Sequence, residues 1–220
     1  MPKKIIYNIP KLNLIFDFDG VIVNSHKVKT LAFYNIFKTY GKNYGLRAQR
    51  FHLKNTGKSR YFKFNYILQN IVKLKVTKKL IMKLDQEFDM YVESRIKKII
   101  PSNHLISFLK NKKRSYNMYI STGTPQRKIE KILKEKKLIT YFKKIYGSPK
   151  LKIEHIRDIK KNGKKCIFIG DSLEDFNAAR NAGIEFILKI NSENIQLRKK
   201  INIKKINSFK SLEKKINLLN

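Results

Sequence analysis

A short apolar run, residues 12–16, stops at Asp17, and a second aspartate, Asp19, follows before Gly20. The run is too apolar for a half-exposed edge strand and is typical of a buried strand in a parallel sheet. Open α/β sheets bind ligands at the carboxyl ends of such strands. Because residues i and i+2 of an extended chain point the same way, we expect the two carboxylates to lie on one face. Their repulsion favours a bound cation, and carboxylate oxygens suit magnesium.

Asp-Gly is also a common turn pair, so an ordinary strand that runs into a turn is the alternative interpretation. The pattern after residue 23 changes to helical spacing. We expect helices over residues 26–40, 61–74 and 77–100, with Gly41 ending the first and Thr77 capping the last. The polar stretch between the first two, which contains Gly45 and continues through residues 56–60, is expected to be loop.

From Pro101 onward, strand and helix patterns alternate. The expected strands cover residues 116–120, 144–146, 166–169 and 185–190, with a short one near Ile206. The expected helices cover residues 102–112, 125–136, 150–161 and 174–182, with another from residue 211. This alternation predicts an α/β fold with a parallel sheet and helices on both faces, into which the helical block of residues 24–100 is inserted after the first strand.

Polar groups follow three more of the expected strands. Residues 121–124, Ser-Thr-Gly-Thr, offer hydroxyl and amide groups that suit a phosphate, although they also suit a helix-capping turn. Lys150 and Lys152 lie at the start of a helix, where a lysine opposes the helix dipole and implies a partner anion. Asp171 ends a buried strand and Asp175 lies four residues later; helix capping is the alternative role for this stretch.

Together and in this order, these stretches resemble the motifs of the haloacid dehalogenase-like hydrolase superfamily, in its capped, phosphoglycolate-phosphatase-like branch. The resemblance runs from Leu12 to about Ile190. The four motifs appear as Asp17-Phe18-Asp19-Gly20, Ile120-Ser121-Thr122-Gly123, Lys152 (or Lys150), and Gly170-Asp171-Ser172 with Asp175.

The resemblance implies a Rossmann-like core of residues 1–23 and 101–220 with a helical cap of residues 24–100. It also implies that Asp17 attacks phosphorus, and that Asp19 protonates the leaving oxygen and then activates water. Magnesium would be held by Asp17, the backbone carbonyl of Asp19 and Asp171, with Asp175 in support.

In the same resemblance, Lys152 and a hydroxyl, Ser121 or Thr122, would hold the phosphoryl oxygens. Gly20 and Gly123 would lie beside the substrate. Dehalogenase relatives lack the second aspartate, because a halide leaves without a proton, so Asp19 implies a phosphate ester.

The helical cap would close over the substrate and exclude water, with hinges near residues 23–25 and 99–101. Its loop of residues 57–60 could bring Lys58 and Arg60 to the non-phosphate end of the substrate; a solvated basic loop is the alternative. The four histidines, His26, His52, His104 and His155, show no metal-ligand spacing and are expected to be structural or on the surface.

The chain carries 50 Lys and Arg against 16 Asp and Glu, a net charge of +34. Such a charge permits nucleic-acid binding, but the sequence has no zinc-finger spacing and no aromatic–glycine signature of an RNA-binding sheet. The excess is lysine, accompanied by much asparagine and isoleucine, as in genomes biased towards A and T. We therefore expect the charge to attract small anionic substrates. Without a long apolar run or a signal-peptide core, we expect a cytoplasmic protein with no membrane partner.

These patterns favour a magnesium-dependent phosphatase that hydrolyses a small phosphate monoester, of the phosphoglycolate or sugar phosphate type. The alternatives are a phosphosugar mutase, which would return the phosphoryl group to its substrate, and a nucleic-acid-binding protein on the same scaffold. The sequence does not indicate the oligomeric state.

Overall fold

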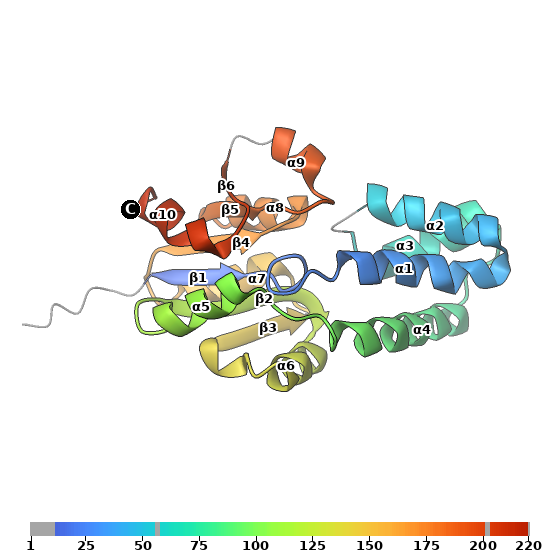
Figure 1. Cartoon of the computed structure of the whole chain (residues 1–220). Helices are drawn as coiled ribbons and strands as arrows, with labels where there is room; N and C mark the ends of the chain where they lie inside the picture. Colours follow the sequence, from blue (N-terminus) through green and yellow to red (C-terminus); the bar gives the residue numbers. More distant parts are fainter. Residues whose placement is uncertain (1–11, 56–57, 201–202, 220) are drawn as a thin grey trace, which may run out of the picture.

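The computed structural model describes residues 12–55, 58–200 and 203–219. Its centre is a six-stranded sheet in the order β3-β2-β1-β4-β5-β6, in which every pairing is parallel (Figure 1). The strands are β1 (Asn13–Phe16), β2 (Asn117–Pro125), β3 (Lys144–Ser148), β4 (Cys166–Gly170), β5 (Glu185–Lys189) and β6 (Lys204–Ile206). The expected parallel α/β sheet is confirmed, although β2 runs beyond the expected end at residue 120.

Helices cover both faces of this sheet. The helices around it are α5 (Asn103–Lys112), α6 (Gln126–Glu135), α7 (Lys152–Lys160), α8 (Leu173–Asn181), α9 (Ile195–Lys200) and α10 (Leu212–Asn217), with the short turns η3 (Ile139–Tyr141) and η4 (Phe209–Ser211). Ile15 of β1 packs in one cluster with residues of α7 and α8, whereas Phe16 contacts Phe108 of α5 and Phe209 of η4 on the other side. Burial on both faces explains why the β1 sequence is continuously apolar.

The helices between β1 and α5 form a separate lobe beyond the carboxyl end of the sheet (Figure 1). This helical lobe consists of α1 (His26–Phe37), η1 (Lys38–Tyr40), α2 (Lys42–Lys54), α3 (Arg60–Tyr66), the π-helical η2 (Ile67–Val72) and α4 (Lys78–Ile96). Its interior contains an aromatic cluster in which Phe33, Phe64 and Phe88 contact one another. Thr77 caps α4 as expected, since its hydroxyl accepts from the N–H of Leu80 at 3.2 Å.

The sequence prediction was wrong for α2, which occupies most of the stretch expected to be loop. Gly45 lies inside this helix, where a Cβ atom would come within 2.8 Å of the Tyr34 carbonyl oxygen of α1. The glycine therefore permits a close approach of two helices and does not break one. Residues 56–57 of the same expected loop lie outside the described residues.

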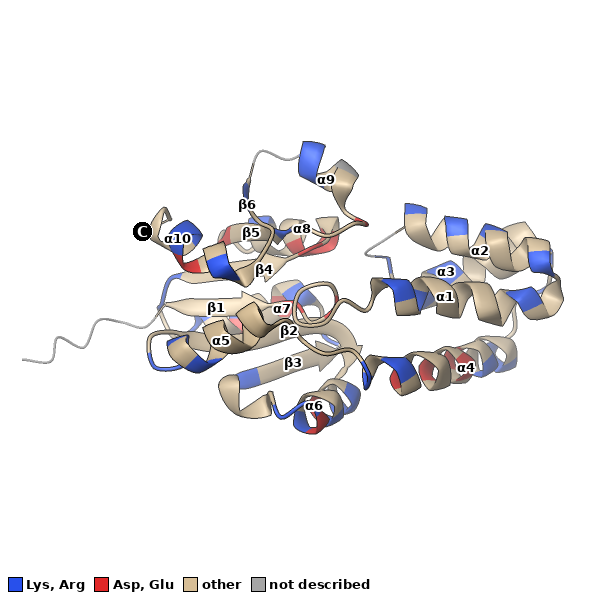
Figure 2. Cartoon of the chain, viewed as in Figure 1, with Lys and Arg blue, Asp and Glu red and all other residues tan. Residues whose placement is uncertain are grey.

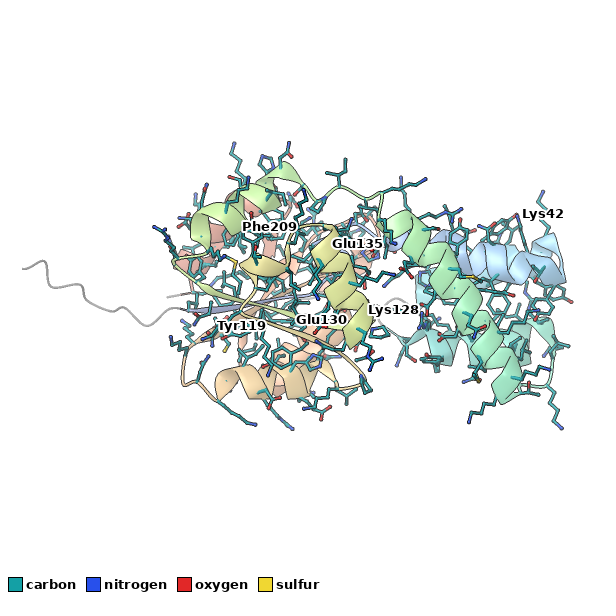
Figure 3. The ribbon with its side chains drawn as sticks, turned by 90° about the horizontal axis from the view of Figure 1, so that it is seen from below. Lys42, Tyr119, Lys128, Glu130, Glu135 and Phe209 are labelled. Atoms are coloured by element: carbon teal, nitrogen blue, oxygen red, sulfur yellow. The ribbon has the colours of Figure 1, made fainter. Side chains whose placement is uncertain are left out.

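Charge is distributed unevenly in the helical lobe. Asp and Glu are missing from the sequence between Asp19 and Asp85, and Figure 2 shows red segments of the lobe on α4 only. Two acids of α4 pair with lysines of α6 across the boundary between lobe and sheet: Asp89 with Lys128, and Glu93 with Lys131 at 2.8 Å. In Figure 3, Lys128 is on the side of α6 that faces α4. These pairs hold the lobe against the core.

We expect Asp89→Asn to lower the free energy of unfolding at pH 7 by about 1 kcal/mol. Burial alone would raise the pKa of Asp89, but its bonds to Arg60 and Lys128 lower that pKa below its ordinary value. A lowered pKa means that the stabilisation is present at neutral pH and is lost as the pH falls from about 4 through the folded-state pKa. Urea unfolding at several pH values measures the difference.

The matched control is Glu87→Gln, because Glu87 lies on the same helix but its pair with Lys83 is exposed and 3.9 Å long. We expect a smaller loss of stability for this variant. An equal loss for both variants, or a loss for Asp89→Asn that does not become smaller as the pH falls below about 4, would contradict a role for Asp89 in joining the lobe to the core.

Candidate active site

The site lies where the chain leaves the carboxyl ends of the central strands. β1 pairs with β2 on one side and β4 on the other, so the strand order changes direction at β1, which is the position at which open α/β sheets bind ligands. Asp17 directly follows β1, and Asp171 directly follows β4. Ser172 caps α8, since its hydroxyl accepts from the N–H of Asp175 at 3.2 Å. In turn, the Asp175 carboxylate accepts from the backbone N–H groups of Asp171 and Ser172. This capping box directs the Asp175 carboxylate back towards the strand.

Lys152 connects two of these carboxylates. Its Nζ lies 3.3 Å from Asp17 Oδ1 and 2.5 Å from Asp175 Oδ1, and all three side chains are buried. Burial raises the pKa of Asp17 well above its ordinary range, against the effect of Lys152, and the neighbouring carboxylates raise it further. Burial alone would lower the pKa of Lys152, but Asp17 and Asp175 raise it. The lysine is therefore a permanent cation at the end of β1.

Asp171 is held from its other side by residues of distant segments. His26 Nε2 and Asn191 Nδ2 both lie 2.7 Å from Asp171 Oδ2, and His26 Nδ1 lies 3.1 Å from Glu193 Oε2. Burial would lower the pKa of His26, but the two carboxylates raise it to about 10, so the imidazole is protonated. Gly20, with φ of +80°, packs against this group, because a Cβ atom there would come within 2.1 Å of Asp171 Oδ2.

The Asp19 carboxylate does not face that of Asp17 across a shared cation, contrary to the expectation from their spacing. It instead accepts from Ser25 Oγ at 2.5 Å and Thr124 Oγ1 at 3.2 Å, and pairs with Lys29 at 2.7 Å. Burial alone would raise the pKa of Asp19, but Lys29 lowers it, so the group is ionised in this structure. The strand ends at Phe16, and the turn that follows separates the two side chains.

A divalent cation fits the remaining carboxylates. One oxygen each from Asp17, Asp171 and Asp175 lies within 4.8 Å of the others. Asp175 already accepts from Lys152 and from the backbone N–H groups of Asp171 and Ser172. The hydrogen bonds of the described residues leave Asp17 Oδ2 and Asp171 Oδ1 unused. Two free carboxylate oxygens in a buried anionic site match the ligands that magnesium prefers.

The two hydroxyl candidates on β2 differ in their surroundings. Ser121 is fully buried, and its Oγ lies 3.0 Å from Nδ1 of His155, which is also fully buried. Thr122 Oγ1 accepts from the backbone N–H of Thr124 at 3.2 Å, which leaves its own hydroxyl hydrogen free to donate. A Cβ atom built on Gly123 meets no other atom within 4 Å, so the space beside this glycine is open.

The other basic residues expected in the site, Lys150, Arg60 and Lys58, lie outside the carboxylate cluster or at its edge. Lys150 is exposed and lies 3.8 Å from Asp158, so Lys152 is the lysine that reaches Asp17. Arg60 pairs with Asp85 at 2.7 Å inside the helical lobe and also with Asp89, which argues against the expected role in substrate binding. Lys58 lies near Glu174, at the start of α8. Burial raises the pKa of the Glu174 carboxyl, and the charge of Lys58 is one of those that oppose this rise.

Sequence reasoning missed several residues of the site, namely His26, Lys29, Asn191 and Glu193, and it expected Thr124 to suit a phosphate, whereas its hydroxyl donates to Asp19. His26 was interpreted as structural or superficial, yet it contacts Asp171, which is 145 residues away in the chain. The acid-free stretch after Asp19 was the available signal for Lys29, because no nearer carboxylate competes for that lysine.

Comparison with known proteins agrees with this arrangement. The family model described as haloacid dehalogenase-like hydrolase matches residues 14–189. No curated protein sequence matches the chain significantly. The fold is similar to that of a haloacid dehalogenase-like hydrolase from Streptococcus pneumoniae, with 20% identity and a TM-score of 0.67 over 92% of this chain and 97% of that one.

Two further solved structures are similar at low identity. A predicted phosphoglycolate phosphatase from Haemophilus somnus has 18% identity and a TM-score of 0.72, over 91% of this chain and 96% of that one. The HAD-hydrolase YfnB from Bacillus subtilis, bound to magnesium, has 18% identity and a TM-score of 0.67, over 94% and 99% of the two chains. These likenesses concern the fold, whereas the family model covers most of the sequence. The chain therefore belongs to the haloacid dehalogenase-like hydrolases.

Proposed function

We propose that this hydrolase is a magnesium-dependent phosphatase that acts on a small phosphate monoester. The observation that carries the proposal is the buried Asp17 carboxylate, which is held by Lys152 on one oxygen and is free on the other. The description of one structural neighbour as a predicted phosphoglycolate phosphatase supports an ester of that size.

In this proposal one oxygen of the Asp17 carboxylate attacks phosphorus, which forms an aspartyl-phosphate and breaks the bond to the ester oxygen, while the other oxygen remains for the cation. Lys152 and Thr122 hold phosphoryl oxygens; we favour Thr122 over Ser121 because the Ser121 hydroxyl is engaged with His155. Magnesium, when bound by Asp17 and Asp171, would supply charge neutralisation for the phosphoryl group.

Asp19 handles the proton in both steps. Protonated Asp19 would donate to the leaving oxygen, and the resulting carboxylate would take a proton from the water that hydrolyses the aspartyl-phosphate. The Lys29 pair favours the carboxylate form, so the first step requires that this contact be loosened when substrate binds. Ser25 and Thr124 keep the carboxylate in place.

We further propose that the helical lobe acts as a cap. It lies beyond the carboxyl end of the sheet, the end at which Asp17 and Asp171 follow their strands (Figure 1). Closure of the lobe there would exclude water from the reaction. The magnesium-bound YfnB structure is described as showing interdomain movement, which supports a lobe that can open and close.

The test is phosphate release from a panel of phosphate monoesters, measured with magnesium and with a chelator. We expect release from at least one ester with magnesium and none with the chelator. Undiminished release in the chelator would contradict the magnesium requirement. A folded protein that releases phosphate from no ester would contradict the phosphatase assignment.

Magnesium is also expected to raise the thermal unfolding temperature of the protein by about 5–10 °C at a concentration of a hundred times the dissociation constant. Asp171→Asn should abolish this shift, because it removes one of the two free carboxylate oxygens. Asp158→Asn, which removes a partly exposed acid of α7, should leave the shift unchanged. A shift that survives in Asp171→Asn would place the magnesium site elsewhere.

A further inference from the structure

Lys63, in the middle of the short helix α3, is a buried cation for which the described residues provide no counterion. Among the described residues two lysines are buried, Lys152 at 8% exposure and Lys63 at 4%. Lys152 has two carboxylates within 4 Å, whereas no carboxylate of the described residues pairs with Lys63. Buried charges in proteins are ordinarily paired, because removing an ammonium group from water is costly. The missing partner of Lys63 therefore needs an explanation.

The immediate neighbours of Lys63 cannot neutralise it. Its Nζ lies 3.2 Å from His52 Nδ1 and 5.6 Å from the centre of the Phe33 ring. Burial and the charge of Lys63 lower the pKa of His52 to about 2, so the imidazole is neutral. Because Nδ1 accepts from the ammonium group, the ring proton is on Nε2, which leaves His52 with a donor of its own.

The pair lies at the end of the helical lobe that faces the core. Figure 1 shows the carboxyl end of α2, which carries His52, and the start of α3 on this side. Burial and the charge of Lys29 lower the pKa of Lys63 to about 8, although Glu174 and Glu193 of the core partly oppose this shift. Lys63 belongs to the lobe, but it lies near enough to Glu174 and Glu193 of the core for their charges to affect its pKa.

Two other cations of the lobe already have carboxylate partners. Arg60, three residues earlier, is neutralised by Asp85 and Asp89, and Lys29 is paired with Asp19. Because the sequence has no acid between Asp19 and Asp85, α1, α2 and α3 contain no internal counterion for Lys63.

We propose that Lys63, with His52 beside it, binds a second anionic group at the non-reacting end of the substrate, a carboxylate or a phosphate. The proposal rests on the phosphatase function proposed above. The substrate is then a phosphate ester with two anionic ends: one end lies at Asp17, and the other supplies the counterion that Lys63 lacks. Lys63 determines specificity and takes no part in the transfer of the phosphoryl group.

The test compares pairs of esters that differ in the second anionic group. One pair is phosphoglycolate and ethyl phosphate; the other is a hexose bisphosphate and the matching monophosphate. Lys63→Met should raise the KM for the preferred dianionic ester about 10–100-fold, as expected for loss of a bond between charged groups. The KM for its matched partner should change by less than about twofold. The pair that responds identifies the second group as carboxylate or phosphate.

Lys79→Met serves as the matched control, since it makes the same change of charge at an exposed site of the lobe. It should leave the KM for every ester unchanged. An equal rise in KM for both members of each pair in Lys63→Met would overturn the proposal, and so would a wild-type enzyme without preference for dianionic esters.

Two further measurements separate this proposal from the phosphatase assignment and from a structural role. Calorimetric binding of phosphoglycolate and the hexose bisphosphate to Asp17→Asn, with and without Lys63→Met, requires no turnover. If Asp17→Asn binds one of these esters and the double variant does not, the Lys63 site is supported even when no ester is hydrolysed. The unfolding temperature of Lys63→Met without ligand should equal or exceed that of the wild type, because an unpaired buried charge is removed; a clear decrease would indicate a structural role instead.

Discussion

Asp17→Asn is expected to abolish phosphate release, with a loss of kcat of at least about 10⁴-fold. The asparagine amide is close in shape to the carboxylate but cannot form the aspartyl-phosphate, so the effect should be on kcat and not only on KM. Single-turnover phosphate release from the preferred ester measures this directly. The control is Asp158→Asn, which removes an acid that pairs with Lys150 and Lys161 away from the site.

The same substitution should not unfold the protein. Burial raises the pKa of Asp17 well above its ordinary range, which means that its ionised form is destabilised in the folded state. At neutral pH, above the ordinary pKa, a neutral asparagine removes that cost, so the metal-free unfolding temperature should be unchanged or higher. Residual activity above about one per cent of wild type would show that another group is the nucleophile, whereas a large loss of stability would leave a structural role for Asp17.

The parts of this site that were predicted from the sequence are those in which chemistry and local structure coincide. Asp17 and Asp171 each end a strand that is buried on both faces, so a continuous apolar run indicates both the strand and the point at which its side chain emerges. Parallel pairing then brings those ends to one edge of the sheet, and the order β2-β1-β4 makes the two strands neighbours.

The prediction failed where a residue type has two physical uses. Gly45 was interpreted as a loop residue, but it allows α2 to approach the backbone of α1. The buried face of α2 consists of Gly45, Ala48 and His52, which is too small and too polar to produce an apolar stripe. The apolar pattern of this segment therefore gives no helical signal, although its buried residues are spaced three and four apart, as in a helix.

The long-range electrostatic partners could not have been predicted. A spacing of two residues indicated that Asp17 and Asp19 would share a cation, but a turn after Phe16 sends the Asp19 side chain to Lys29. Likewise, the choice between Lys150 and Lys152 depends on where α7 begins, because Lys150 precedes the helix whereas Lys152 is its first residue and lies beside Asp17. Such choices are made by tertiary packing, since both alternatives are equally compatible with the local sequence.

Lys152→Met is expected to have the largest effect on stability, with a loss of about 3–5 kcal/mol in the free energy of unfolding at pH 8. The variant removes the cation that pairs with Asp17 and Asp175 and leaves two buried carboxylates without compensation. Because Asp17 can take up a proton as the pH falls, the loss should become smaller between pH 8 and pH 5. Urea unfolding at both pH values without magnesium measures the change.

The matched control is Lys150→Met, which removes a lysine two residues away whose side chain is 64% exposed. It should change the free energy of unfolding by less than about 0.5 kcal/mol. Lys152→Arg, which keeps the charge but not the shape, should recover part of the stability while phosphate release stays low, because the guanidinium group cannot occupy the same position between Asp17 and Asp175. Equal stability of the Lys152→Met and Lys150→Met proteins would contradict this prediction. It would mean that the buried carboxylates become protonated when the lysine is absent. A bound cation would then be the only positive charge that balances ionised Asp17.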